Sequence, residues 1–420
     1  MLRMILLALV FWPSVSALAM DQQRTASETA TSAQAIVGPT SGSAEAQPAL
    51  AQSDGNPILE HYRDYLTALE AGDFATAERE ADAAFGESLA RHGHAGRTGA
   101  LALNLAIVRL RLGRHSDAGA PARLAVDAAR DINSGVDQLT AELVRVRAEI
   151  GSSPQFRDIA SLERAAFDAL ERATDRSPAL DDYAYEVALD LARFELRMGR
   201  YRQVDRAVEY GLQSSGGAEL PAAVARAHAL IVRGAARIYQ GQERHAAAPI
   251  DEALQLLQPY AVETDQPELT LGQSYYVQAL LWRSFADAVV ASRIGQLDQN
   301  SVSFQFLPRA GEAPLCVFSV SAQSAVGLPE EELGNGAGAA VIGLRIDADG
   351  SVTASEVLAA SSSAFREALS QVDSWRLERL AESAPGCRTQ TNRYLVGLSY
   401  AAAPWQQRWP NLLSPAQLPL

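Results

Sequence analysis

Side chains that commonly do chemistry are sparse in this chain of 420 residues, and few of them lie close together. Of six histidines, only His92 and His94 form a close pair, and no cysteine or third histidine stands nearby to complete a metal site. The pair falls between two predicted helices, so we expect an exposed loop. Asp347 and Asp349 have the spacing that opens a calcium loop, but Val352 occupies the position that requires glycine, so a hairpin turn is predicted.

The basic residues are all arginine, because the sequence contains no lysine. The absence of lysine excludes P-loop nucleotide-binding proteins, enzymes that form a Schiff base on lysine, and protein kinases, which need a catalytic lysine. A formal net charge of −14 and an isoelectric point near 5.0 disfavour non-specific binding of nucleic acid. The sequence therefore predicts a binding protein and not an enzyme, with no catalytic residue, no cofactor and no metal. An enzyme whose site is built on helical repeats is the alternative.

The clearest strand signals lie near the C-terminus. Apolar residues alternate from Ala340 to Ile346, turn-forming residues follow at Asp347–Gly350, and Val352–Leu358 returns as a hairpin partner. Apolar residues at helical spacing in Phe365–Val372 predict a helix, and alternation in Tyr394–Tyr400 predicts a third strand. The pattern predicts a β-β-α-β unit, which is a small antiparallel sheet with one helix on its apolar face.

This order of parts resembles the C-terminal domain of TonB, the periplasmic energy transducer, over about 65 residues. The parts that carry the resemblance are Ile342–Ile346, Asp347–Gly350, Val352–Leu358, Ser361-Ser362, Phe365–Val372 and Trp375-Arg376. Two places differ from the family pattern: Leu328-Pro329 stands for a Tyr-Pro pair, and Leu377–Arg379 for Phe-x-Pro. The resemblance therefore implies the fold more than the energy-transducing role.

The N-terminus has the three parts of a secretory leader. Arg3 supplies the positive charge, Met4–Trp12 the short apolar run, and Ala17-Leu18-Ala19 the cleavage pattern. We therefore predict a signal peptide over residues 1–19, followed by a disordered linker over residues 20–56. Together with the bacterial resemblance, the leader implies the periplasm. The alternative is an uncleaved leader that anchors the protein in the inner membrane.

Residues 57–295 have a helical pattern with internal repetition. Four helix ends carry a glycine followed five positions later by a small or apolar residue: Gly72 and Ala77, Gly113 and Ala118, Gly199 and Val204, Gly241 and Ala246. This arrangement resembles tetratricopeptide repeats, with Gly151 as a degenerate turn. The predicted fold is an α-helical solenoid followed by the small α+β domain. An ordinary helical domain without repeat symmetry is the alternative.

The last predicted helix, residues 268–292, is rich in aromatic rings and lies where a solenoid needs a terminal cap. We expect its rings, among them Tyr275 and Trp282, to pack in the core, with a peptide-binding groove as the alternative. A linker over residues 296–312, the TonB-like domain over 313–402 and a Pro/Trp/Leu-rich tail over 403–420 complete the predicted organisation.

Two site predictions follow from export and from the resemblance. Cys316 and Cys387 are the only cysteines, and an oxidising compartment favours a disulfide between them, with two buried free thiols as the alternative. In TonB-like domains the final strand lies at the sheet edge and binds an extended partner by strand addition. The residues predicted to form that edge are Arg393, Tyr394, Leu395, Val396, Leu398 and Tyr400. Alternatively, the C-terminal tail covers the edge.

The sequence thus predicts a periplasmic scaffold for protein–protein interactions. Its repeats hold a protein partner, and its small domain docks on another protein of the cell envelope. The alternative is a membrane-anchored, TonB-like energy transducer that acts on outer-membrane transporters.

Overall fold

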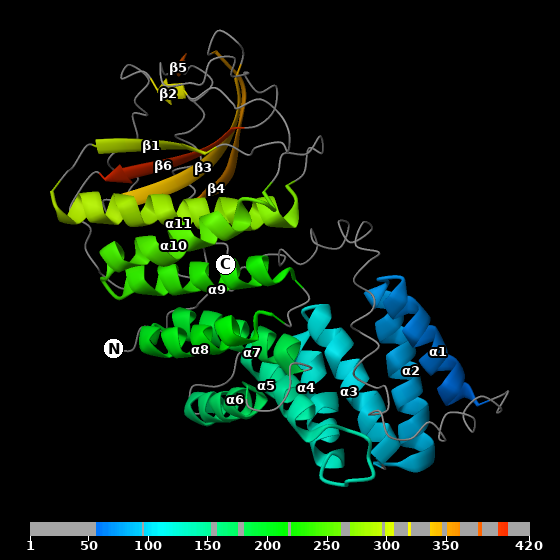
Figure 1. The fold of residues 1–420 in the computed structure, drawn as a ribbon. Helices are drawn as coiled ribbons and strands as arrows, with labels where there is room; N and C mark the ends of the chain where they lie inside the picture. The colour runs from blue at the N-terminus through cyan, green and yellow to red at the C-terminus, as the bar shows by residue number, and fades with distance from the viewer. Residues whose placement is uncertain are drawn as a thin grey trace, which may run out of the picture. The chain divides into compact units, whose positions relative to one another are not determined.

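The computed structural model describes eleven helices and six strands (Figure 1). The described residues are 56–94, 96–152, 158–174, 180–216, 220–261, 269–295, 299–305, 318–320, 337–346, 351–361, 377–379 and 394–401. A helical region precedes a small antiparallel sheet, which confirms the predicted order. The chain divides into two units, residues 1–153 and residues 154–420.

The first unit contains five described helices: α1 (Pro57–Glu70), α2 (Phe74–His92), α3 (Gly96–Arg111), α4 (His115–Ala128) and α5 (Gln138–Gly151). Three of them start at side-chain caps, where Asn56, Asp73 and Asp137 accept hydrogen bonds from the first backbone amides of α1, α2 and α5. Helices α1 and α2 pack as one hairpin, α3 and α4 as a second, and α5 packs on both α3 and α4.

The second unit contains six described helices: α6 (Ile159–Thr174), α7 (Asp181–Arg197), α8 (Tyr201–Ser214), α9 (Ala222–Tyr239), α10 (Glu243–Leu257) and α11 (Leu271–Arg293). Hairpins α7–α8 and α9–α10 are followed by α11, which starts at a capping box between Thr270 and Gln273. Helix α7 contacts α9, and α9 contacts α11, so these three helices form one layer.

One turn design recurs in the four hairpins. Gly72, Gly113, Gly199 and Gly241 have φ angles of 71°, 70°, 71° and 76°. Each glycine amide donates to the carbonyl three residues earlier, and the next amide donates to the carbonyl five residues earlier, at 2.8 to 3.1 Å. This pair of bonds is a Schellman motif, which satisfies the carbonyls at a helix end and favours glycine in the left-handed conformation. The four predicted turn glycines are therefore all found in turns.

The predicted small residues also lie in the hairpin cores. Ala77, Ala118, Val204 and Ala246 are fully buried in the second helix of each hairpin. Gly151 differs from its prediction, because it lies at the end of α5 and forms no left-handed turn. An added Cβ there would lie 2.1 Å from the ring of His115, so this position needs glycine for close packing.

The main sheet has four described strands in the order β1-β6-β3-β4, all antiparallel. Their bounds are β1 (Gln299–Gln305), β3 (Ala337–Ile346), β4 (Val352–Ala360) and β6 (Tyr394–Ala401). Strands β2 (Phe318–Val320) and β5 (Leu377–Arg379) form a separate pair. Strand β1 lies within the segment predicted as a linker. The helix predicted at Phe365–Val372 lies outside the described residues.

Helix α11 packs on the sheet as well as on α9 and α10, as Figure 1 shows. Trp282 is fully buried and contacts the Tyr239 ring of α9, whereas Leu280 and Ser284 face β6. A Cβ at Gly397 would lie 2.6 Å from the Ser284 hydroxyl, so glycine allows the close approach of strand and helix. The predicted terminal cap is therefore an apolar helix held between two layers, and its Trp282 ring belongs to the core.

Candidate functional site

The predicted docking strand lies inside the sheet and not at its edge. Strand β6 pairs with β1 through Gln299–Gln305 on one side and with β3 on the other. Tyr394, Leu395, Val396 and Leu398 are buried. The edge position is thus corrected: β1 already bonds to the backbone groups that were expected to be free. The backbone of Tyr400 pairs with Asn300 and Gly338.

Of the remaining predicted site residues, only the two histidines lie in the described part of the chain. Arg393, Cys316, Cys387, Asp347 and Asp349 lie outside the described residues. His92 and His94 are exposed at the end of α2. In the part of the chain that the structure describes, no three His, Cys, Asp or Glu side chains are grouped to hold a metal ion.

A buried polar cluster lies in the layer formed by α7, α9 and α11. It consists of Tyr185 and Arg193 of α7, His228 of α9 and Tyr275 of α11, and we call it the inner-layer cluster. Arg193 Nη2 lies 2.7 Å from His228 Nε2, and the Tyr275 ring centroid lies 4.6 Å from that of His228. The Tyr185 hydroxyl lies 3.4 Å from His228 Nδ1 and donates to the Ala225 carbonyl at 3.2 Å.

These contacts fix the protonation of His228. Arginine can only donate, so Nε2 must accept from Arg193, and the ring proton lies on Nδ1, facing Tyr185. Burial, followed by the charge of Arg193, lowers the pKa of His228 well below its ordinary value. Burial raises the pKa of Tyr185. His228 is therefore a neutral positioning group whose basic nitrogen is already occupied, which makes it unsuited to proton transfer with a substrate.

Arg193 is the part of this cluster that a ligand can reach. Its side chain is 28% exposed, and Nη1 donates to Asp190 at 3.3 Å. Because His228 and Asp190 hold the guanidinium in place, its orientation is set before a partner arrives. The cluster can therefore bind an acceptor group, such as a carboxylate or a backbone carbonyl, at a fixed position on this layer.

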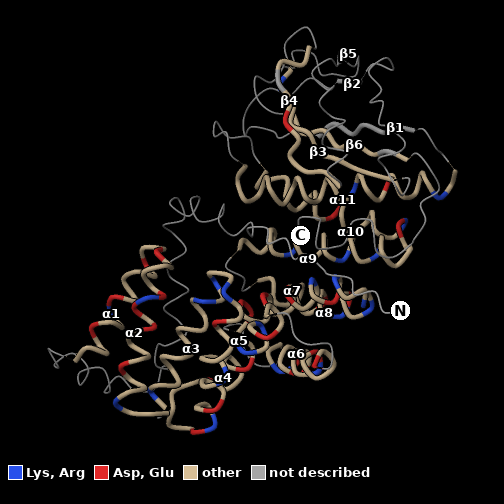
Figure 2. The backbone as a smooth tube through the Cα atoms, turned by 180° about the vertical axis from the view of Figure 1, so that it is seen from behind, with Lys and Arg blue, Asp and Glu red and all other residues tan. Residues whose placement is uncertain are grey.

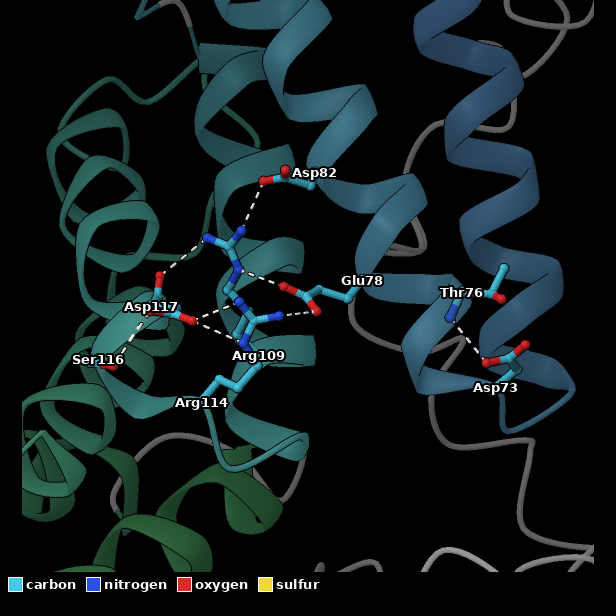
Figure 3. Close-up of polar contacts among 8 residues, drawn as sticks. All are labelled: Asp73, Thr76, Glu78, Asp82, Arg109, Arg114, Ser116 and Asp117. Atoms are coloured by element: carbon cyan, nitrogen blue, oxygen red, sulfur yellow. Dashed lines mark hydrogen bonds and ion pairs between the residues drawn. The ribbon is translucent and has the colours of Figure 1, made fainter. Parts of the chain in front are cut away.

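Ion pairs join neighbouring elements in the first unit (Figure 3). Arg109 of α3 contacts Glu78 at 3.0 Å and Asp82 at 2.9 Å, both on α2. Arg114, which follows the turn glycine, contacts Glu78 of α2 at 2.5 Å and Asp117 of α4 at 2.7 Å. Two arginines thus bridge three carboxylates and hold the two hairpins of this unit together.

The second unit has related ion pairs, each built on a single arginine between two acids. Arg233 of α9 contacts Asp205 at 3.6 Å and Glu209 at 2.8 Å, two acids of α8 with the spacing of Glu78 and Asp82. Arg200, which follows its own turn glycine, contacts Glu163 of α6 and lies 3.2 Å from Glu195 of α7. None of these arginines is among the site residues predicted from the sequence. Two sequence signals could have identified them: the arginine directly after the glycine at Arg114 and Arg200, and, for Arg109 and Arg233, acids spaced four apart on the neighbouring helix.

Comparison with known proteins yields no match to a protein-family model and none to a curated protein. None of helices α1 to α11 combines the length and the apolar character of a membrane-spanning segment.

Proposed function

We propose that this protein is a scaffold for protein–protein interactions, whose hairpins are of the tetratricopeptide type and hold a segment of a partner protein. The observation that carries the proposal is the recurrence of one hairpin design, with the same glycine turn and the same buried small residue in four places. Stacked hairpins present a continuous surface that extends over several repeats, which suits the binding of an extended segment.

The inner-layer cluster supplies the anchor in this proposal. Arg193 presents a positioned cation on a layer built from α7, α9 and α11, and Tyr275 adds an aromatic surface beside His228. Arginine and tyrosine contribute strongly to protein interfaces, since both combine a large contact surface with directed hydrogen bonds. We therefore place the partner segment over these residues, with one of its acceptor groups on Arg193.

The sheet has a secondary role in this proposal. We propose a TonB-like domain in the periplasm, supported by the strand–turn–strand pattern and by the leader. Strand addition would have to use β4 and not β6. Strand β4 pairs only with β3 among the described strands, carries the exposed Glu356 and has two register shifts. Charge and bulges disfavour edge pairing, so the helical layer is the stronger candidate for partner binding.

Capture from cell-envelope extracts by the full chain tests this proposal. Arg193→Gln removes the anchoring charge, and we expect specific partners to bind roughly tenfold more weakly or worse, the effect of losing a charged hydrogen bond. Arg226→Gln is the matched control, because Arg226 is an exposed arginine of α9 that pairs with Glu252 of α10. Equal capture by the unaltered chain and by Arg193→Gln would contradict the proposed site.

A further inference from the structure

Two buried carboxylates share one arginine in the second unit. Glu195 lies on the buried face of α7 and has no exposed surface, and Glu163 lies on the buried face of α6. Arg200 contacts both from the turn between α7 and α8, and 35% of its side chain is exposed. We call Glu163, Arg200 and Glu195 the shared-arginine cluster. With both carboxylates ionised, it carries one negative charge more than its single cation balances.

Glu195 is the less well satisfied of the two acids. Arg200 Nε lies 3.2 Å from Glu195 Oε2, but neither carboxylate oxygen accepts a hydrogen bond within the described residues. A buried carboxylate without hydrogen bonds is costly, and a neighbouring negative charge adds to the cost. Binding a proton greatly lowers the first cost and removes the second, since the neutral acid needs no counter-ion and does not repel Glu163.

The groups around Glu195 favour its protonated form. The charged groups that act on Glu195 are Arg200 from the turn and Glu163 from α6, and α8 and α9 add none among the described residues. Burial raises the pKa of Glu195 to about 7, an effect opposed by Arg200 and increased by Glu163. Ionisation of this one side chain therefore changes the charge of the cluster near neutral pH.

Glu163 and Glu195 compete for Arg200, and Glu163 connects this competition to α6. Glu163 lies on the same face of α6 as Ala166, Phe167 and Leu170, which are buried where α6 packs on α7 and α8. While Glu195 is ionised, it competes with Glu163 for the ion pair with Arg200. When Glu195 is neutral, Arg200 pairs with Glu163 alone and ties α6 to the α7–α8 turn.

We propose that the shared-arginine cluster is a proton-operated latch. Uptake of one proton by the Glu195 carboxylate releases Arg200 to hold Glu163, which docks α6 firmly on the α7–α8 hairpin. Loss of that proton restores the excess negative charge and loosens α6. The latch makes the α6 end of the second unit sensitive to mild changes of pH, and it operates without a partner protein.

Hydrogen exchange of the full chain, read by mass spectrometry and corrected for intrinsic exchange rates, tests this proposal. Between about pH 5.5 and about pH 8.5, we expect the protection of α6 to fall roughly 10- to 100-fold in the unaltered chain. In Glu195→Gln, which mimics the protonated acid, we expect a change of less than about threefold. Glu163→Gln should move the transition to lower pH, because it removes the repelling charge.

Glu78→Gln is the matched control, since Glu78 pairs with Arg114 at the corresponding turn of the first unit. It should leave the pH dependence of α6 as it is in the unaltered chain. Protection of α6 that does not change with pH, or that falls equally in Glu195→Gln, would overturn the proposal. Should Glu195→Gln fail to fold, carbon-13 NMR can follow the titration of the glutamate carboxyls in the unaltered chain. A midpoint near 7 is expected, and titration of all glutamates near their ordinary value of about 4.5 would overturn the latch.

Discussion

Arg114 and Arg200 occupy the same place in two hairpins, directly after the turn glycine, yet their surroundings differ. Arg114 and its partner Asp117 are 46% and 44% exposed, whereas Glu195 beside Arg200 is fully buried. The difference arises four residues before each glycine. The first unit has Arg109 at that position and the second has Glu195, so one site has two arginines and the other has one arginine between two acids.

This comparison shows that one backbone design can support two electrostatic roles. The Schellman turn holds the residue after glycine against the neighbouring helix in both units. With a second arginine, the site is a network of ion pairs that is partly exposed: Asp82, Arg114 and Asp117 are accessible to water, whereas Arg109 and Glu78 are less so. Its exposed pair between Arg114 and Asp117 contributes little to stability by itself. With a glutamate, the site contains a fully buried acid whose ionisation is costly, which makes its stability depend on pH. Figure 2 shows how charged residues follow the helices, whereas β3, β4 and β6 contain only Arg345 and Glu356.

The largest expected difference between the two sites is in the response to loss of the arginine. Arg200→Ala leaves Glu163 and Glu195 buried without a cation, which should destabilise the second unit by roughly 3–5 kcal/mol at about pH 8. The loss should be smaller at about pH 5.5, where Glu195 binds a proton. Arg114→Ala should cost the first unit about 0–1 kcal/mol, because Asp117 is accessible to water and Arg109 remains paired with the less exposed Glu78.

Chemical denaturation at the two pH values measures these costs, and hydrogen exchange assigns them to a unit. Equal costs for Arg200→Ala and Arg114→Ala would show that burial does not distinguish the two sites in solution. The comparison would then reduce to two surface ion pairs.

The next prediction concerns packing, where the two units should behave alike. Ala118 of α4 and Ala246 of α10 are fully buried five residues after their turn glycines. Ala118→Leu and Ala246→Leu should each overpack a helix crossing and cost roughly 1–3 kcal/mol in thermal or chemical unfolding. Ala120→Leu and Ala248→Leu are matched controls, because these alanines are exposed two residues further along the same helices. If only one of the two substitutions at buried positions lowers the stability, the two hairpins do not pack alike.

The hairpin turns could be predicted because their signals are local. A glycine that ends a helix and a small residue five positions later are fixed by turn geometry and by the close approach of two helices. The burial of Glu195 also has a signal in the sequence, because this glutamate interrupts the apolar face that includes Ala188 and Ala192. Its partner Glu163 lies on another helix, and sequence spacing alone does not bring the two together.

The arrangement of the sheet was harder to predict because it depends on distant contacts. Strand β1 contains the alternating apolar residues Val302 and Phe304, but nearby glycine and proline favoured a linker. Its pairing with β6 moves that strand from an edge to the interior. Helix α11 is apolar on more than one face, which indicates burial on two sides, but its second neighbour is a strand about a hundred residues away.

The smallest expected effect contrasts the two units in acid. Hydrogen bonds from Arg114 lower the pKa of Asp117, so the folded first unit holds this proton less readily than the unfolded chain does. The stability that Asp117 contributes is present above its unfolded pKa and is lost as the pH falls through the folded value. Glu195 has the opposite sign: its pKa is raised to about 7, so the second unit loses stability as the pH rises from about 4.5 to about 7.

Asp117→Asn should therefore make the protection of α3 and α4 slightly less sensitive to acid and leave the response of α6 near neutral pH unchanged. Hydrogen exchange across a pH series measures both in one experiment. The same substitution in an Arg114→Ala background should have a much smaller effect on acid sensitivity, because only the charge of Arg109 and the hydrogen bond from Ser116 still lower the Asp117 pKa. If Asp117→Asn changes acid sensitivity equally in both backgrounds, Arg114 is not what sets that pKa. The opposite pH responses of the two units would then have separate origins, unrelated to the shared position of their arginines.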